Sequence, residues 1–430
     1  MHEREASKAG CRHSLRLDVK ERNVEFELDS DNQAFTESFR SFCAAEIGPL
    51  NEMVEDKREI PREQFKKLAD VGYLGLLHET RYGGQGASYL TATLAQAILS
   101  EYCGSTFFST GASAGLFGGP IGTHGSDAQK QKYLPAIIGG ELIGALGVTE
   151  PDAGTDVNGL RTTATAHGDD IILNGQKTYI TNAPVCDHAL ILARYTDKDG
   201  KHHGLTHFIV DMNTEGVSRG KNMRKLGLKG SPTGEIFMQD VKVKAGDILG
   251  RPGLGFRLTM ETFNKERLSL GAYSVGVMAA CLDESRSYSR SRKSFGRPIY
   301  KHQSVGFMLA DMLTKYDAAR MLLLETAWLM DRFAPPQYVQ PPARRRGQKR
   351  MHNGHEVDLT AKCATVKLLA STYAREVTNL AVQLHGGAGY MEEYKVSRLY
   401  RDVKLAEIGG GTSEIQKQII ARFESKRVKA

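Results

Sequence analysis

The spacing of hydrophobic and polar positions divides the chain into three parts. From about residue 30 to 145, apolar residues recur every three or four positions, as in DNQAFTESFRSFCAAEI and YLTATLAQAILSEYC, which predicts helices. From 146 to 254 the segments are short and rich in β-branched residues, as in IILNGQKTYIT and HALILARY, which predicts strands. Long helical runs return from 255 to 430. We therefore expect a mostly α protein with an N-terminal helical domain, a β-barrel-like middle domain and a C-terminal four-helix bundle.

Two segments depart from this pattern. Residues 1–29 form an N-terminal extension that mixes acidic and basic residues and lacks an apolar core, which favours neither a secretory signal nor a mitochondrial presequence. Residues 334–356 contain four prolines and a basic run, which predicts a solvated loop inserted between two bundle helices. Docking of an acidic partner or a nucleic acid is the alternative for this insertion.

Composition sets the broad class of protein. Of the 430 residues, 40% are hydrophobic and 25% charged, which is typical of a globular enzyme, and no apolar stretch is long enough to span a membrane. The net charge is +7, but five positive charges fall between 344 and 350, so the body is only mildly basic. The six cysteines form no CxxC pair or metal-binding pattern, which indicates free thiols, no metal and a reducing compartment. We expect the cytoplasm, or the mitochondrial matrix in a eukaryote.

The segment LGVTEPDAGTDVNGL, residues 146–160, stands at the junction of the helical and β regions. Its Thr, acidic, Pro and Gly residues provide exposed backbone N–H groups and two hydroxyls, which suit the polar edge of a planar cofactor. A plain turn-rich loop is the alternative.

Four further motifs follow in order: YITN (179–182), SRKSFGRPIYKHQ (291–303), QLHGGAGY (383–390) and YRDVKLAEIGGGTSEIQ (400–416). Together with TEPDAGTD, they make the chain similar to the acyl-CoA dehydrogenase family from about residue 30 to the C-terminus. The resemblance implies bound FAD, an acyl-CoA substrate, a homotetramer and an electron-transfer flavoprotein as the electron acceptor.

The resemblance also assigns residues to the cofactor. Its flavin ring would be lined by Val148, Thr149 and Thr155 and faced by Tyr179 and Thr181; Arg292, Phe295, Gln303, Gln383 and Gly387 would reach the flavin of a neighbouring subunit; Thr412 and Glu414 would lie near the adenosine and phosphates. The last helix would begin at this point, where Ser413 and Gln416 have the spacing of a capping box.

The catalytic base is expected on a helix. In many members of the family, the residue before the Gly-Thr of the GGGT loop is the glutamate that removes the α-proton, but here that residue is Gly410. A branch resembling isovaleryl-CoA and long-chain acyl-CoA dehydrogenases places the base on a bundle helix, and Glu266 in FNKERLSLGAYSVG falls on the matching position. The alternative for Glu266 is an ordinary ion pair with Lys265, Arg267 or a residue one turn away.

The resemblance implies a reaction. Glu266 would take the α-proton of a saturated acyl-CoA while the β-hydrogen leaves as hydride to FAD, giving a trans-2-enoyl-CoA. The Gly410 N–H and a flavin ribityl hydroxyl would stabilise the enolate, and exclusion of water would raise the pKa of the carboxylate. The expected substrate contacts are Thr155, Asn264, Arg267, Gly410 and Gly411, although Asn264 stands where several relatives have Asp.

Two other functions stay open. One is oxidation of an acyl or aminoacyl group tethered to a carrier protein, and the other is a non-catalytic scaffold or nucleic-acid binder that acts through the basic insertion. The reduced flavin could serve a dehydrogenase or an oxidase. Gly271, Ala272 and Gly276 indicate either room for a bulky acyl chain or close helix packing.

Overall fold

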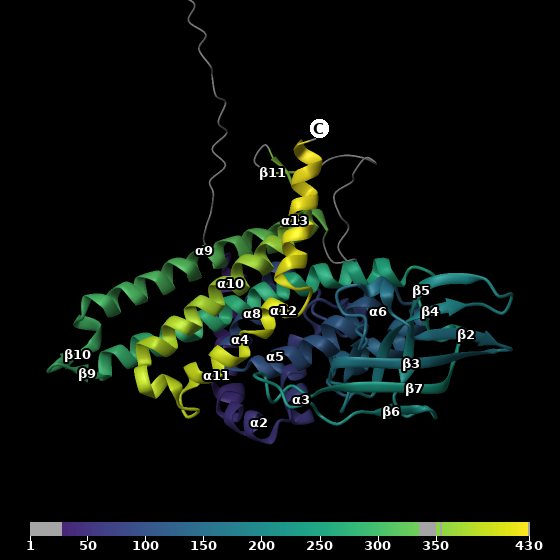
Figure 1. The fold of residues 1–430 in the computed structure, drawn as a ribbon, viewed down its shortest axis with the longest axis horizontal. Helices are drawn as coiled ribbons and strands as arrows, with labels where there is room; N and C mark the ends of the chain where they lie inside the picture. The colour runs from purple at the N-terminus through teal and green to yellow at the C-terminus, as the bar shows by residue number, and fades with distance from the viewer. Residues whose placement is uncertain (1–27, 335–349, 353–354, 429–430) are drawn as a thin grey trace, which may run out of the picture.

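The computed structural model describes residues 28–334, 350–352 and 355–428 (Figure 1). Helices come first in the chain, a β-sheet domain follows at one end of the long axis, and long helices complete the chain. The predicted order of α, β and α regions is confirmed. The extension up to residue 27 and the basic run at 335–349 lie outside the described residues.

The N-terminal part is helical. Its α-helices are α1 (Ser30–Phe42), α2 (Asn51–Lys57), α3 (Arg62–Asp70), α4 (Tyr89–Tyr102), α5 (Gly104–Thr110), α6 (Gly119–His124) and α7 (Asp127–Ile138). Between α5 and α6 the chain winds as a π-helix, η5 (Gly111–Gly118), a form that is rare and often occurs at functional sites. The start of α4 is fixed by Asp331, whose carboxylate accepts hydrogen bonds from the N–H groups of Tyr89 and Leu90.

The middle part is one eight-stranded sheet. Its strands are β1 (Gly144–Gly147), β2 (Thr163–His167), β3 (Asp170–Thr181), β4 (His188–Thr196), β5 (His202–Asp211), β6 (Val217–Arg219), β7 (Thr233–Lys244) and β8 (Ile248–Leu249). They follow the order β6-β7-β3-β2-β4-β5-β8, and β1 pairs in parallel with β4. The sheet is open, so the predicted barrel-like closure is wrong. The two edge strands, β6 and β8, have only three and two residues, too few for a ladder that would close the sheet.

The C-terminal part is built on three long helices, α8 (Gly255–Ser291), α9 (Gln303–Phe333) and α10 (Leu359–His385), which pack together. The fourth predicted helix, α13 (Ser413–Val428), packs on α10 and projects from the body, and Gln416 is its buried residue (Figure 1). Shorter elements join them: the hairpins β9 (Lys293–Ser294) with β10 (Arg297–Pro298) and β11 (Met351–His352) with β12 (His355–Glu356), then α11 (Lys395–Asp402) and α12 (Leu405–Ile408).

The small residues of α8 serve helix packing. A Cβ atom on Gly271 would collide with Val366 of α10, and one on Gly276 would collide with the backbone of Ala97 in α4. Both glycines therefore allow α8 to lie close to its neighbours. Of the two alternatives for these positions, close packing is the one that the structure supports.

Cysteines and helix hydrophobicity give two further observations on the described residues. The five cysteines among them are free and buried, and Cys11 lies outside them. No helix in the described ranges combines the length and the apolar character needed to cross a bilayer.

A buried ion pair anchors the loop that follows β1. Lys177 of β3 is fully buried, and its Nζ lies 2.7 Å from Glu150 Oε1 and 3.2 Å from the carbonyl oxygen of Val148. Glu150 also accepts hydrogen bonds from the Thr162 hydroxyl and from the N–H groups of Arg161 and Thr162. Because the carboxylate is satisfied from several sides, the pair tolerates burial and holds residues 148–150 against β3.

We expect Lys177→Met to destabilise the protein by about 3–5 kcal/mol, because it leaves the Glu150 carboxylate buried without its cation. Denaturant unfolding of the full-length variant and parent, followed by circular dichroism, measures the change in the free energy of unfolding. Lys244→Met is the matched control, since Lys244 pairs with Asp170 at the surface of the same sheet, and its effect should be much smaller. Equal effects of the two substitutions would contradict this account.

Candidate active site

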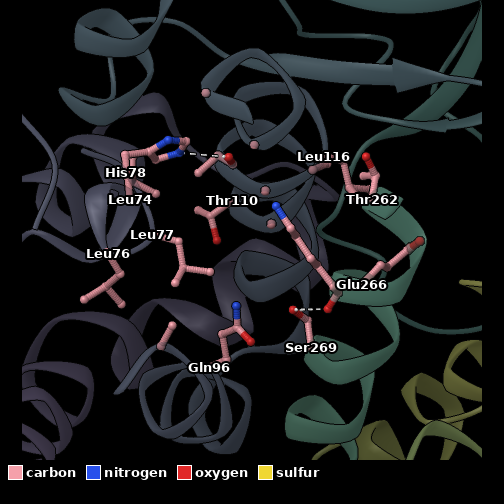
Figure 2. A pocket seen from close by; sticks show the side chains of 18 of the residues that line it. Leu74, Leu76, Leu77, His78, Gln96, Thr110, Leu116, Thr262, Glu266 and Ser269 are labelled. Atoms are coloured by element: carbon pink, nitrogen blue, oxygen red, sulfur yellow. Dashed lines mark hydrogen bonds between the residues drawn. The ribbon is translucent and has the colours of Figure 1, made fainter. Parts of the chain in front are cut away.

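A cavity of about 160 Å³ lies between the N-terminal helices and α8 (Figure 2). One wall is α8, which presents Thr262, Lys265, Glu266, Ser269 and Leu270. These positions recur at intervals of three and four residues along α8 and so share one face of the helix. The facing walls come from residues 73–79, from α4 and α5, and from η5, and they are largely apolar. The cavity therefore places a carboxylate in a mainly hydrophobic enclosure.

Glycines widen the cavity on the side of η5. A Cβ atom on Gly111, Gly115 or Gly119 would meet no atom within 4 Å, and all three residues line the cavity. Their spacing of four residues puts them on the same side of the winding chain. The empty space beside them belongs to the cavity.

Glu266 is the acidic group of this site for which the described residues supply no hydrogen bond at Oε2. The Oε2 atom is also buried. Burial raises the pKa of Glu266 to about 7, against the opposing positive charges of Arg267 and Lys367. The neighbouring Arg267 is also buried, and its Nη1 donates to Asn264 Oδ1 at 2.6 Å. The alternative of an ordinary ion pair for Glu266 therefore finds no support in the described part of the chain.

The structure brings Glu266 and Gly410 together. Gly410 and Gly411 have φ values of +62° and +91°, which glycine adopts without strain. A Cβ atom on Gly410 would lie 3.5 Å from Cδ of Glu266. The helix carboxyl group thus reaches the space next to the loop position at which many members of the resembled family carry their base.

Of the predicted flavin-facing residues of the β-domain, Val148 and Thr149 lie beside β3, the strand that carries Tyr179 and Thr181. Val148 and Thr149 are tied to β3, since the Thr149 carbonyl accepts a hydrogen bond from the Thr178 N–H at 2.9 Å. Tyr179 interrupts the strand register with φ of +58°, and its side chain is 69% exposed. An exposed aromatic ring on a strained backbone is a feature of binding sites. Thr181 ends β3, and Thr155 is exposed on the loop before β2.

Five other predicted residues gather elsewhere. Arg292 follows α8, Phe295 lies at the tip of the β9–β10 hairpin, and Gln303 begins α9. Gln383 and Gly387 lie at the end of α10, which meets the end of α8 where Tyr288 stacks on His385. This group is at the opposite end of the long axis from the sheet (Figure 1). A single chain does not bring it to Tyr179.

The hairpin tip is built to expose an aromatic ring. Phe295 and Gly296 form a two-residue turn in which both have positive φ, +50° and +77°, as type I′ hairpin turns require. The Phe295 side chain is 94% exposed. A large apolar ring held out in this way marks a contact surface.

The start of α13 differs in one detail from the sequence prediction. Thr412 precedes the helix and Glu414 lies exposed in its first turn. The predicted capping box of Ser413 and Gln416 is wrong, because Gln416 Oε1 has no partner in the described residues and its Nε2 donates to the carbonyls of Gly410 and Gly411. The glutamine binds the preceding turn instead of the helix N-terminus.

Sequence reasoning missed four residues of this region: His78, Gln96 and Lys265 in the cavity wall and Lys367 beside it. His78 bonds to the carbonyl of Ala114 at 3.1 Å, and burial lowers its pKa to about 4, so its ring is neutral. Only Lys367 carries a sequence signal, since it falls on the apolar face of its helix. The described residues contain no His, Cys, Asp and Glu cluster that could hold a metal.

Comparison with known proteins identifies the family. Family models match residues 29–141 (acyl-CoA dehydrogenase, N-terminal domain), 145–241 (middle domain) and 253–424 (C-terminal domain). The chain is 38% identical to probable acyl-CoA dehydrogenase YngJ of Bacillus subtilis, over 93% of this chain and 99% of that protein. It is 37% identical to the caffeyl-CoA reductase-Etf complex subunit CarC of Acetobacterium woodii, over 93% of this chain and all of that protein.

A solved structure agrees with these matches. Butyryl-CoA dehydrogenase from Megasphaera elsdenii superposes with a TM-score of 0.82 at 34% identity, over 93% of this chain and 99% of that one. The family predicted from the five motifs is thereby confirmed: the chain belongs to the acyl-CoA dehydrogenase family.

Proposed function

We propose that the chain converts a saturated acyl-CoA to a trans-2-enoyl-CoA, with Glu266 as the base that removes the α-proton. The observation that carries this assignment is the Glu266 carboxyl group at the cavity wall, whose Oε2 atom is buried and has no partner in the described part of the chain, and which is adjacent to Gly410. A base is most effective when its pKa is near the working pH, and that of Glu266 is raised to about 7.

FAD is the cofactor of this family, and the chain offers surfaces that fit it. Tyr179 presents an exposed aromatic ring beside the backbone of Val148 and Thr149, which suits one face of a flat ring. We assign Thr155 and Thr181 to the same flavin site, and Thr412 and Glu414 to the adenosine end. When bound, FAD supplies the acceptor for the β-hydrogen, which leaves as hydride.

Acidification of the α-carbon needs a hydrogen bond to the thioester oxygen. We assign this role to the Gly410 N–H, because the turn at Gly410 and Gly411 lies next to Glu266 and carries no side chain that would block the thioester. A hydrogen bond of this kind is strongest where charge develops in an enclosure without water. Arg267 donates to Asn264 on α8, next to Glu266 in sequence, and neither residue lines the cavity; we propose that the pair contacts the substrate outside the cavity.

The cavity has room for an acyl group that is branched or aromatic. The three glycines at 111, 115 and 119 border open space, and Phe107 and Phe108 add aromatic rings to the wall. This favours a bulky acyl group over a straight chain of the same length.

We further propose that a second copy of the chain completes the flavin site within a homotetramer. Arg292, Phe295 and Gln303 are exposed on elements at the end of the long axis opposite the sheet, and Tyr179 is exposed on β3 of that sheet, so the two groups can act on one cofactor only between chains. Arg292 offers the planar, two-pronged donor that suits a pyrophosphate.

An electron-transfer flavoprotein is the proposed electron acceptor, supported by the relationship to an Etf-complex subunit. The same relative is named a reductase, which favours a second candidate function: reduction of an enoyl-CoA by the same residues in the reverse direction. In that direction Glu266 would donate a proton to the α-carbon, which is the microscopic reverse of its removal of the α-proton.

We expect Glu266→Gln to slow reduction of the bound flavin by about 10²–10⁴-fold, because the proton acceptor is lost while the shape of the site is kept. The measurement is anaerobic mixing of the holoenzyme with straight, branched and aryl acyl-CoAs while flavin absorbance is followed. Glu261→Gln, at a partly exposed position five residues earlier on α8, should react like the parent.

Two further arms of that experiment separate the other functions. If acyl-loaded carrier protein bleaches the flavin and acyl-CoA does not, the substrate is a carrier-bound acyl group and the proposed acyl-CoA substrate is wrong. Faster reoxidation of reduced enzyme by enoyl-CoA than reduction by acyl-CoA would favour the reductase. An undiminished rate in Glu266→Gln would exclude this residue as the base.

The pH dependence follows from the raised pKa of Glu266. We expect kcat/KM to rise about tenfold per unit below pH 7 and to level off above it, because only the ionised carboxylate accepts a proton. Steady-state rates between about pH 5 and 9 test this expectation. A limb centred near the ordinary glutamate pKa of about 4.3 would show that the group is not buried in the working enzyme.

We expect Arg292→Ala to weaken FAD retention by about tenfold or more, since it removes charge-assisted hydrogen bonds to the cofactor of the adjoining subunit. Flavin-to-protein absorbance ratios after gel filtration, with light scattering for the oligomeric state, report the loss. Arg297→Ala, in the same exposed hairpin, is the control. A monomer that keeps its FAD would contradict the shared site.

A further inference from the structure

Two side chains from different helices hold the glycine turn beside the base. Lys367 of α10 is completely buried, and its Nζ donates to the Gly411 carbonyl at 2.8 Å. Gln416 of α13 is also fully buried, and its Nε2 donates to the carbonyls of Gly411 at 2.7 Å and Gly410 at 3.1 Å. Both carbonyls of the turn therefore point to fixed donors.

These bonds restrict a segment that would otherwise be mobile. Glycines at positive φ lose more conformational freedom on folding than any other residue. A trans peptide unit is planar, so holding its carbonyl also sets the direction of its N–H group. Fixing the carbonyls of Gly410 and Gly411 therefore orients the two peptide units and, through the Gly410 Cα, limits where the Gly410 N–H can point.

Lys367 also brings a charge to the base. Arg267 on α8 and Lys367 on α10 are the cations that act on the Glu266 carboxylate. Lys265 lies in the same cavity wall, and the neutral His78 stands across from it. Acidic groups near Lys367 are Glu407 of α12, which already pairs with Arg375 and Lys404, and Glu414 of α13, which is exposed.

The lysine has few bonds for a buried ammonium. Within the described residues it forms one hydrogen bond, to a neutral carbonyl, and no ion pair. Burial without a carboxylate partner is unfavourable for a charged group, and it lowers the pKa of Lys367 to about 8. An uncompensated positive charge at this depth acts strongly on a nearby carboxylate, because the surroundings screen it poorly.

We propose that Lys367 is a positioning residue of the active site, which fixes the Gly410–Gly411 turn through the Gly411 carbonyl and places a buried positive charge beside Glu266. This inference depends on the proposed role of Glu266 as the base. In this proposal, α10 positions the Gly410–Gly411 turn relative to Glu266 on α8, although α10 contributes no residue to the cavity wall.

The test uses the FAD-loaded enzyme with two substitutions. Lys367→Met removes the donor and the charge at similar length, whereas Lys367→Gln removes the charge and retains an amide donor. Lys362→Met is the control, because Lys362 lies on the same helix in a surface ion pair with Glu325. Each variant is also made in the Glu266→Gln background.

The first readout is the pH profile of flavin reduction. In both Lys367 variants we expect its midpoint to move up by about one unit, which lowers the ionised fraction of Glu266 at pH 7 from about one half to about one tenth, a fivefold slower rate. Raising the pH should restore this fivefold loss of rate, because it ionises Glu266 again. Lys367→Met should show a further loss on the order of tenfold at every pH, because the turn is also displaced.

The second readout does not depend on turnover. A carboxyl group whose pKa is raised by folding contributes stability that is fully present below its unfolded pKa and is lost as the pH rises through its folded pKa. The unfolding midpoint of the parent should therefore fall relative to Glu266→Gln between about pH 4 and 7 and then level off. In the Lys367 backgrounds the levelling should occur about one unit higher.

Each outcome decides the proposal. Unchanged midpoints in both readouts would overturn the role of the charge, and identical rates of the Met and Gln variants at all pH values would overturn the role of the hydrogen bond. If Lys367→Met does not fold, the midpoint shift in Lys367→Gln decides alone. If Glu266→Gln reduces its flavin at the parent rate, the base assignment fails, while the unfolding data still measure whether Lys367 acts on Glu266.

Discussion

The Glu266 carboxyl group and the backbone of Gly410 border the same small space, and the rest of the site depends on this. A Cβ atom on Gly410 would lie 2.7 Å from Cδ1 of Leu270, which is closer than carbon atoms normally approach, and 3.5 Å from the carboxyl carbon of Glu266. A long acidic side chain on the loop and another on α8 would compete for this space. The glycine in the turn and the acid on the helix are therefore one arrangement, in which neither residue can be judged without the other.

Burying polar groups with few partners beside the cavity lowers the stability of the folded protein. Interactions in other parts of the molecule offset this loss. Among the residues that the structure describes, a carboxyl oxygen without a partner and a lysine with a single hydrogen bond both lie buried near the cavity. Close packing of α8 against α10 and α4, which Gly271 and Gly276 permit, holds the helix that carries the acid. On the other side, the satisfied Lys177–Glu150 pair fixes the loop of Val148 and Thr149 to its strand. Strain of this kind is common at functional sites, where local interactions are not optimised for stability.

Much of the fold and part of the site could be predicted from the sequence, because both depend on local pattern. Hydrophobic spacing distinguishes α8 from β3, and five ordered motifs lead to the family and to the pairing of Glu266 with Gly410. What failed depends on geometry that local pattern does not contain. The openness of the sheet follows from the shortness of β6 and β8. Gln416 has capping-box spacing, but the carbonyls of a tight turn lie closer to its amide. His78 and Lys367 meet the site only through tertiary packing, whereas Lys265 reaches the cavity wall from the helix that carries Glu266.

Division of the proposed flavin-binding residues between the sheet and the distant β9–β10 hairpin would link cofactor binding to assembly. Tyr179 and the Arg292–Phe295 hairpin are each exposed and far apart in one molecule. A cofactor that contacts both groups binds the assembled protein better than the separate chain, and a ligand stabilises the state that it binds. If the proposed shared site holds, the same linkage requires that loss of FAD weakens the assembly and that separation of the chains weakens FAD binding. Glu266 on α8, by contrast, receives its turn, its neighbouring lysine and its cavity from its own chain. In the proposed mechanism, proton transfer is therefore organised within one subunit, while the hydride acceptor would be held between two.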